Sequence, residues 1–255
     1  MIKAEHVIKS FGEQQVIKNL TLEFETGMTN LIIGRSGSGK TVLLKMLVGL
    51  IKPDSGKIYY DDDEFYSMNA KELQALRMRV GMLFQGSALF DSMSVEENIR
   101  FPLDMFTTST RLEKQKRVDY CLERVGLSGN NKKFPSELSG GMQKRVGIAR
   151  AIVLKPMYLF CDEPNSGLDP KTALLIDELI YSITKENNIT TIINTHDMNS
   201  VMEIGETVSF LNNGLLAWRG SKSEVLKSNN EDLHDFIFAS PFLQKLLDDA
   251  GEKLA

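Results

Sequence analysis

The residues best suited to chemistry form the run GRSGSGKT, from Gly34 to Thr41. The run matches G-x-x-x-x-G-K-[ST], follows the apolar stretch MTNLIIG and precedes leucines at helical spacing. Backbone amides can wrap phosphate groups only where Cβ atoms are absent, which explains the glycines. Lys40 would bring a positive charge to the β- and γ-phosphates, and the Thr41 hydroxyl would reach a magnesium ion. The predicted nucleotide-binding residues are Gly34, Arg35, Ser36, Gly37, Ser38, Gly39, Lys40, Thr41 and Val42.

A pair of carboxylates follows another apolar stretch, in YLFCDEP. Asp162 would hold the magnesium ion, and Glu163 would point toward the γ-phosphate and polarise the attacking water. Read alone, Glu163 could also be an ordinary acidic residue at a strand end. The chain lacks an N-K-x-D signature for recognising guanine, so ATP is favoured over GTP.

Two further polar residues end predicted strands. Gln85 follows RVGMLF and could coordinate magnesium or water, while His196 follows TIINT. Parallel strands gather ligand groups at their carboxyl ends, so both side chains would lie near the nucleotide. Taken singly, such a histidine is more often structural and such a glutamine proves nothing.

A second helix start with the character of an anion site lies in ELSGGMQKRVGIARAI. Ser139, Gly140 and Gly141 offer a hydroxyl and backbone amides at a helix N-terminus, where phosphate binds favourably. The basic residues that follow, Lys144, Arg145 and Arg150, are typical of a solvated helix face. The net charge of -4 also disfavours nucleic-acid binding.

Composition predicts one domain with a sizeable core, since the chain has 255 residues and is 42% hydrophobic. Cys121 and Cys161 lie far apart in apolar surroundings and read as small buried hydrophobes. The first residues, MIKAEHVIKSFGEQQ, contain no apolar signal core, and the apolar run TVLLKMLVGLI is too short for a membrane span. We therefore expect a cytosolic protein without membrane-spanning segments.

Hydrophobic periodicity predicts the elements that position these residues. The first forty residues alternate like strands, and βαβ patterns surround the acidic pair. Two S/T-x-x-E capping boxes, at Ser94 and Thr110, begin helices within an insertion from about residue 90 to about 155. Asn213-Gly214 between apolar runs predicts a hairpin. The expected fold class is α/β: a P-loop core with an antiparallel β portion and an inserted helical subdomain.

In this order, the motifs resemble those of the ATP-binding subunit of ABC transporters. Gly34 to Thr41 resembles the Walker A loop, Gln85 the Q-loop, LSGGM the signature loop, and YLFCDE the Walker B strand. SGLD, at 166–169, resembles the D-loop, His196 the switch histidine, and Phe11 the aromatic residue that stacks on adenine. The resemblance implies a RecA-like core over residues 1–230, with a C-terminal helical extension over 231–255.

The resemblance also implies partners. In the family, two ATP-binding domains pack head to tail, so Ser139, Gly140 and Gly141 would contact the γ-phosphate held by the other subunit of a homodimer. ATP hydrolysis would drive a separate multi-span permease. The chain would lie at the periphery of a bacterial inner membrane, on its cytoplasmic face. The apolar candidates for the permease contact could equally fill the core of the helical insertion; they are Leu89, Phe90, Met93 and Phe101.

The LSGGM motif, with Met142 after the glycines, looks like the ATPases of MCE-type lipid transporters such as the Mla system. This resemblance implies a phospholipid or related cargo and an MCE-domain partner. FQGSAL and Asn165 depart from the usual sequences. The alternatives are an amino-acid or small-solute importer and a soluble ATPase outside transport. The tail, with apolar residues from Leu233 to Leu247, predicts two short amphipathic helices that pack on this domain or reach the neighbouring subunit.

Overall fold

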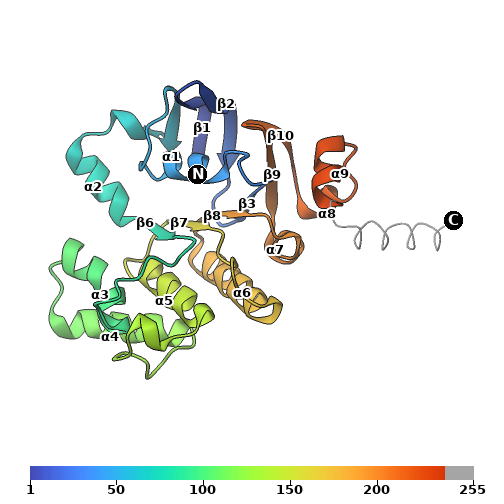
Figure 1. Ribbon diagram of the computed structural model, residues 1–255. Helices are drawn as coiled ribbons and strands as arrows, with labels where there is room; N and C mark the ends of the chain where they lie inside the picture. Colours follow the sequence, from blue (N-terminus) through green and yellow to red (C-terminus); the bar gives the residue numbers. More distant parts are fainter. Residues whose placement is uncertain (239–255) are drawn as a thin grey trace.

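Two β-sheets carry the helices in the computed structural model, which describes residues 1–238 (Figure 1). The larger sheet has the strand order β10-β9-β3-β8-β7-β6, and the smaller has the order β2-β1-β4-β5. Neighbours in the larger sheet are parallel except β9 and β10, whereas the smaller sheet is antiparallel. This arrangement confirms the predicted α/β class, with a RecA-like P-loop core and an antiparallel β portion.

The strands are β1 Ile2–Phe11, β2 Gln14–Phe24, β3 Thr29–Ile33, β4 Ser55–Tyr60, β5 Asp63–Glu64, β6 Val80–Leu83, β7 Tyr158–Asp162, β8 Thr190–Thr195, β9 Thr207–Asn212 and β10 Leu215–Gly220. The helices are α1 Lys40–Leu47, α2 Ala70–Met78, α3 Val95–Phe106, α4 Arg111–Arg124, α5 Gly140–Ile152, α6 Pro170–Asn187, α7 Met198–Ile204, α8 Lys222–Val225 and α9 Glu231–Ile237. Asn213 and Gly214 both have positive φ and form the turn of the predicted β9–β10 hairpin.

Strands β3, β7 and β8 of the larger sheet are buried along their whole length, which explains the apolar runs within them. In β3, Leu31 and Ile33 point into a core that includes residues of α5 and α6. Ile32 points the other way, into a core formed with α1 and the smaller sheet. Because successive side chains of a strand point to opposite faces, one short strand serves both cores and holds the loop that follows it in place.

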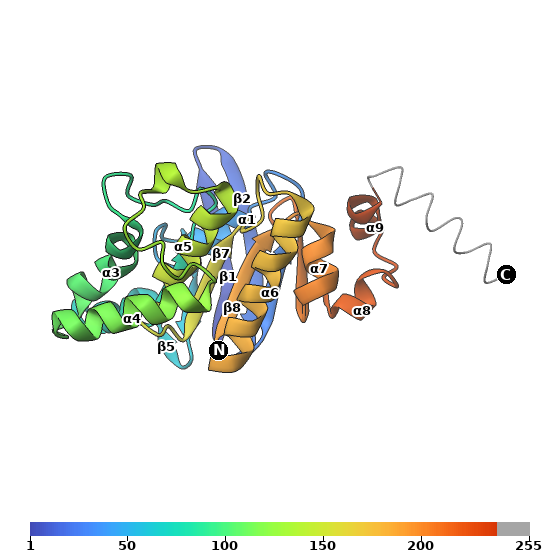
Figure 2. The same cartoon turned by 90° about the horizontal axis from the view of Figure 1, so that it is seen from below.

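Helices α3, α4 and α5 lie together on one side of the larger sheet (Figures 1 and 2). Both predicted capping boxes are present: Ser94 and Thr110 accept from the backbone amides of Glu97 and Glu113. An apolar stripe along α4 and the residue after it is buried, and it comprises Val118, Cys121, Leu122 and Val125. These helices occupy the stretch expected to form the helical insertion.

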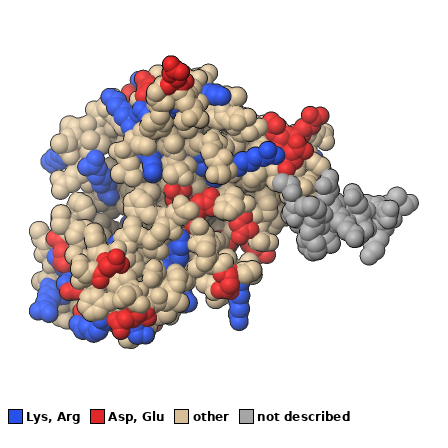
Figure 3. All heavy atoms as spheres, viewed as in Figure 1, with Lys and Arg blue, Asp and Glu red and all other residues tan. Residues whose placement is uncertain are grey.

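Cys121 and Cys161 are both buried and free, as predicted. Within residues 1–238, no helix combines the length and apolar character needed to span a membrane. Basic and acidic side chains are interspersed on the face shown in Figure 3. The first predicted tail helix corresponds to α9, where Leu233 is fully buried, while the rest of the predicted extension lies outside the described residues.

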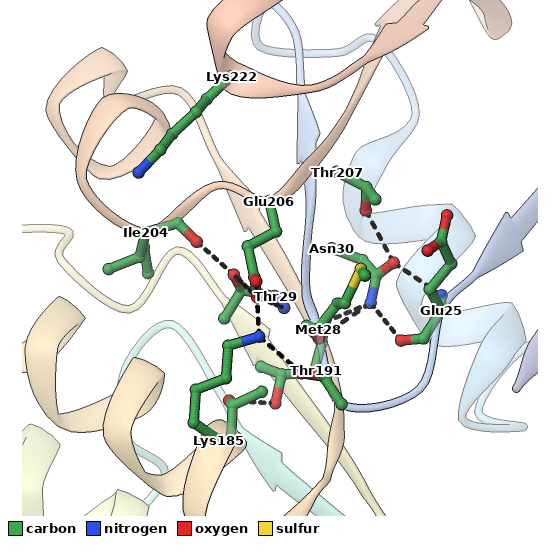
Figure 4. Close-up of polar contacts among 12 residues, drawn as sticks. Glu25, Met28, Thr29, Asn30, Lys185, Thr191, Ile204, Glu206, Thr207 and Lys222 are labelled. Carbon is green, nitrogen blue, oxygen red and sulfur yellow. Dashed lines mark hydrogen bonds and ion pairs between the residues drawn. The ribbon is translucent and has the colours of Figure 1, made fainter.

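Polar side chains fix the amino-terminal ends of β3, β8 and β9 (Figure 4). The side-chain oxygen of the buried Asn30 accepts from the Glu25 amide and the Thr207 hydroxyl, both at 2.8 Å. Glu206 accepts from Lys185 Nζ at 2.5 Å and from the Thr29 amide at 3.0 Å. The Asn30 amide group donates to the main-chain oxygens of Glu25, Met28 and Thr191. Side-chain hydrogen bonds therefore tie these strand ends to one another.

Candidate nucleotide-binding site

A cavity of about 660 Å³ opens at the carboxyl-terminal edge of the larger sheet. It brings together four predicted catalytic residues from four separate segments: Lys40, Gln85, Glu163 and His196. The full lining comprises Val16, Arg35, Ser36, Gly37, Gly39, Lys40, Thr41, Val42, Gln85, Glu163, His196 and Phe236. Residues far apart in the sequence thus share one concave site, which is the usual form of a small-molecule site.

The loop between β3 and α1 needs its glycines for reasons that the geometry makes explicit. Gly34 has φ +150°, and a Cβ there would lie 2.3 Å from the main-chain oxygen of Leu211. Gly39 has φ +104°, and a Cβ there would lie 2.6 Å from Ile17 Cδ1. A side chain at either position would force the loop or its neighbours to shift. The amino-terminal end of α1 therefore remains open to an anion.

Lys40 provides the positive charge of this loop and is only 7% exposed. Its ammonium group donates to the main-chain oxygens of Gly34 at 2.8 Å and Arg35 at 3.2 Å. Burial lowers the pKa of Lys40, and the nearby Glu163 and Asp162 oppose that shift. The buried Ser38 hydroxyl has no hydrogen-bond partner within residues 1–238. The loop thus offers a cation to a phosphate group, whereas Ser38 does not line the cavity.

The residues at the end of β7 suit a magnesium ion. Thr41 Oγ1 donates to Asp162 Oδ1 at 3.1 Å, and Asn194 Nδ2 donates to the same oxygen at 3.1 Å. Hydroxyl and carboxylate oxygens are the ligands that Mg²⁺ prefers, together with water and substrate phosphates. Among the described residues, no three His, Cys, Asp or Glu side chains form a closed metal cluster. The site therefore fits an ion held jointly by a few protein oxygens and a nucleotide.

Glu163 lies directly after Asp162 and has the left-handed φ of +48°. Its Oε2 lies 2.8 Å from Nδ1 of His196, whose side chain is largely exposed. The exposed Gln85 donates through Nε2 to the Ser166 hydroxyl at 3.4 Å. The predicted water-orienting carboxylate, histidine and glutamine thus surround the same edge of the cavity.

The second anion-binding helix start does not line this cavity. Ser139 is the N-cap of α5 and accepts from the Met142 amide at 3.3 Å. Ser139 and Gly140 are exposed, whereas Gly141 is buried, and a Cβ on Gly141 would lie 2.5 Å from Thr172 Cγ2. The glycine therefore lets α5 pack closely against the first turn of α6. The start of α5 is therefore separate from the cavity beside the Gly34–Thr41 loop.

Phe11 is 49% exposed at the end of β1, with Lys9 Nζ 5.5 Å from its ring centre. It does not line the cavity, although its exposed ring remains available for stacking. Val16 and Phe236 do line the cavity, and the sequence reasoning missed both. Phe236 carries no local signal, because it reaches the site only through the packing of α9. Its ring lies 5.3 Å from that of Phe210 in β9.

The prediction that Lys144 and Arg150 occupy a solvated face is wrong. Lys144 is only 4% exposed, and Arg150 donates to the main-chain oxygens of Ser87 at 2.6 Å and Ala88 at 2.8 Å. Both cations point toward the segment after β6. Burial on that side depends on a segment about sixty residues earlier in the chain, which helical periodicity cannot reveal.

The apolar residues after Gln85 divide between two roles. Leu89 packs against the core shared with α3 and α5. Phe90 is 41% exposed, and its ring lies 5.0 Å from that of Phe101. The insertion's own core therefore accounts for Leu89, while Phe90 leaves an aromatic surface open to solvent.

A family model described as ABC transporter matches residues 17–166. The chain is 38% identical over 236 residues to the "Probable ribonucleotide transport ATP-binding protein mkl" of Mycobacterium leprae (strain TN), covering 92% of this chain and 68% of that protein. It is 38% identical over 237 residues to the "Methionine import ATP-binding protein MetN" of Clostridioides difficile (strain 630), covering 93% and 74%. The chain spans about two thirds of the length of the mycobacterial relatives it matches.

Among solved structures, the chain is similar to a bacterial ABC transporter cassette whose structure is dimeric. The TM-score is 0.80 with 32% sequence identity, and the match covers 87% of this chain and 99% of that cassette.

Proposed function

This chain belongs to the ABC transporter family, and from that premise we propose that it is the ATP-hydrolysing subunit that drives a separate membrane permease. The observation that carries the proposal is the cavity where the Gly34–Thr41 loop meets the end of β7. There Thr41 contacts Asp162 at 3.1 Å, while Glu163 and His196 lie 2.8 Å apart. A phosphate-binding loop, a magnesium-binding pair and a candidate general base thus share one site.

In this mechanism, the loop amides and Lys40 hold the β- and γ-phosphates, and Lys40 turns from the loop carbonyls toward the phosphate oxygens. Thr41, Asp162 and Gln85 would hold Mg²⁺, which neutralises the charge that develops on the phosphate oxygens. Glu163 orients and polarises the attacking water. His196 contacts the γ-phosphate and, through its position beside Glu163, keeps that carboxylate directed into the cavity. Phe11 stacks on the adenine base.

The active assembly that we propose is a homodimer with two equivalent ATP sites. Ser139 and Gly140 are exposed at the start of α5 and stand outside the cavity of their own chain. A symmetric head-to-tail pair would place them, with Gly141, against the γ-phosphate bound by the other subunit. Each chain therefore carries both halves of a site that it cannot complete alone.

Phospholipid or a related lipid is the cargo that we propose, moved with a multi-span permease and an MCE-domain protein at the cytoplasmic face of a bacterial inner membrane. The support is the LSGGM motif followed by its basic pair, together with LFQ before SALFDSMSVEENI and FPL. The exposed ring of Phe90 is a candidate contact for the permease. A second candidate function is small-solute import, which the similarity to the methionine import protein favours. A soluble ATPase outside transport is the third.

Mass spectrometry of the detergent-extracted complex separates these candidates. Lipids retained with a multi-span protein and an MCE-domain protein are the expected result. Retention of a solute-binding protein would favour small-solute import, and a stable complex without any membrane subunit would refute the transporter assignment.

Glu163→Gln tests the chemistry. The substitution removes the water-orienting carboxylate but leaves the phosphate loop intact, so ATP hydrolysis should fall by about a hundredfold or more while ATP binding persists. The ATP-bound protein should then accumulate as a dimer, which size-exclusion chromatography with ATP and Mg²⁺ can detect. Near-normal turnover would remove Glu163 from the mechanism.

A further inference from the structure

The ammonium group of Lys144 is buried on α5 between two segments of the candidate active site. It donates to the main-chain oxygen of Gln85 and lies 3.4 Å from the main-chain oxygen of Glu163. The residue is 4% exposed, and no carboxylate pairs with it within salt-bridge distance in the part of the chain that the structure describes. A buried charge without such a pair is costly, so its carbonyl partners must compensate for it.

The two acceptors lie at the ends of adjacent parallel strands. Gln85 follows β6 and Glu163 follows β7, and Leu83 of β6 pairs with Cys161 of β7. The pairing of β6 with β7 ends at this point. The ammonium of Lys144 contacts the segments after both strands. Its three hydrogens allow it to donate to the carbonyls of Gln85 and Glu163 at once.

The backbone at both acceptors is unusual and needs support. Glu163 has φ +48°, and Ser87 and Ala88, just after Gln85, have φ +59° and +47°. Residues with side chains adopt this left-handed conformation only at an energetic cost, so the surrounding contacts must hold them in it. Lys144 contacts the main-chain oxygen of Glu163, and Arg150 donates to the main-chain oxygens of Ser87 and Ala88.

Close approach of α5 makes these contacts possible. Lys144, Gly147 and Arg150 recur at intervals of three and share one helix face. A Cβ on Gly147 would lie 2.7 Å from Leu83 Cδ1 and 3.6 Å from Ser87 Cβ. The helix therefore rests directly on the segment that leaves β6, with one cation on either side of the glycine. Movement of α5 must shift the carbonyls bound by both cations.

We propose that Lys144 is a positioning residue that couples the amino terminus of α5 to Gln85 and Glu163. The inference rests on the proposed function, because Ser139 at that terminus would bind the nucleotide of the neighbouring subunit. Engagement of Ser139 fixes α5, and Lys144 then holds the backbone of Glu163 and Gln85 in the geometry required for hydrolysis. One side chain thereby links the nucleotide of the neighbour to the chemistry of its own subunit.

Lysine is suited to this role because its charge sits on a long stem with rotatable donors. Methionine has similar length but cannot donate, so Lys144→Met removes the two contacts and keeps most of the packing. Lys144→Arg retains the charge and the donors with a different geometry. Lys116→Met, at an exposed position on α4, is the matched control for loss of a lysine charge.

The experiment measures ATP hydrolysis, binding of a fluorescent ATP analogue and backbone hydrogen exchange of residues 85–88 in the full chain. For Lys144→Met we expect kcat to fall about tenfold or more while KM and analogue binding change less than about threefold. Amides of residues 85–88 should exchange faster, and ATP should no longer slow them. Lys144→Arg should recover part of the lost kcat, and Lys116→Met should behave as wild type.

Unchanged kcat in Lys144→Met would overturn the proposal. The proposal would also be overturned if analogue binding and the thermal unfolding midpoint fell together with kcat, since that pattern indicates a purely structural role. If Lys144→Met fails to fold, the same measurements on Lys144→Arg distinguish a positioning role from a structural one. Glu163→Gln measured in parallel separates the two levels of inference. If Glu163→Gln abolishes turnover and Lys144→Met does not, only the role of Lys144 fails. If Glu163→Gln retains turnover, the proposed function fails.

Discussion

The free energy of unfolding of the Asp177→Asn variant, measured relative to that of wild type, should rise as the pH rises. Asp177 lies on α6 and is 1% exposed, and its Oδ1 has no hydrogen-bond partner within residues 1–238. Burial raises the pKa of this carboxyl to about 6, more than Ser200 and Asn165 lower it by hydrogen bonding. The nearby Asp197 and Glu203 raise the pKa further. The folded protein therefore favours the uncharged acid.

The sign and size of the effect follow from this pKa. The ordinary value is 3.8, so the folded state binds the proton more tightly than the unfolded state. Stability from this group is complete below about pH 4 and is lost as the pH rises through about 6. Each pKa unit corresponds to about 1.4 kcal/mol, which gives a total loss of about 3 kcal/mol. About half of it should develop between pH 5 and pH 8.

Urea unfolding of the nucleotide-free chain at pH 5, 6, 7 and 8, followed by circular dichroism, measures the effect. Asp177→Asn carries no charge at any of these values, so its stability relative to wild type should rise by about 1.5 kcal/mol across the series. Asp104→Asn is the control. Slight burial raises the pKa of that exposed carboxyl, but Arg100 and Lys114 outweigh burial and lower it, so the control should show no trend in this range. A constant difference between Asp177→Asn and wild type would refute the reasoning.

Two further substitutions test other parts of the structure. Ser139→Arg should abolish hydrolysis yet preserve ATP-analogue binding to the monomer, because Ser139 lies outside the cavity of its own chain; lost monomer binding would contradict the split site. Glu206→Gln should lower the free energy of unfolding by about 1–2 kcal/mol at pH 8, since it weakens the contacts to Lys185 and the Thr29 amide. Burial raises the pKa of Glu206, but these partners outweigh it and lower the pKa, so the difference should shrink as the pH falls through that lowered pKa; an equal loss at pH 4 would exclude the carboxylate charge as the cause.

Local signals accounted for much of the fold. The glycine-loop pattern is typical of a turn between a strand and a helix, which is where the loop lies. Ser94 and Thr110 cap their helices through contacts with residues three positions later in the sequence. The Asn213-Gly214 hairpin follows from backbone preferences alone. Such features depend on neighbours in the sequence, so one sequence suffices to predict them.

Features that depend on tertiary packing were beyond that reasoning. Lys144 has the pattern of a surface residue, and only the approach of α5 to the segment after β6 buries it. Phe236 reaches the cavity because α9 packs beside Phe210. Asn194 lies in an apolar strand, yet it donates to Asp162 because β7 and β8 are adjacent. None of these contacts leaves a periodic signal in the sequence.

A few contacts connect α5 and α7 to the loops at the catalytic edge of the sheet. Asn165, in the loop after Glu163, donates to Ser200 of α7 at 3.0 Å, and α7 begins just after His196. Gly141 lets α5 pack against the start of α6, and Lys144 binds the carbonyls near Glu163. The Lys144 contact joins α5, whose amino terminus would meet the neighbouring subunit in the proposed dimer, to the segment that carries Glu163. In the proposed dimer, Lys144 therefore connects the nucleotide contact of Ser139 to the backbone of Glu163. Substitutions in these contacts should therefore change kcat more than the affinity for ATP.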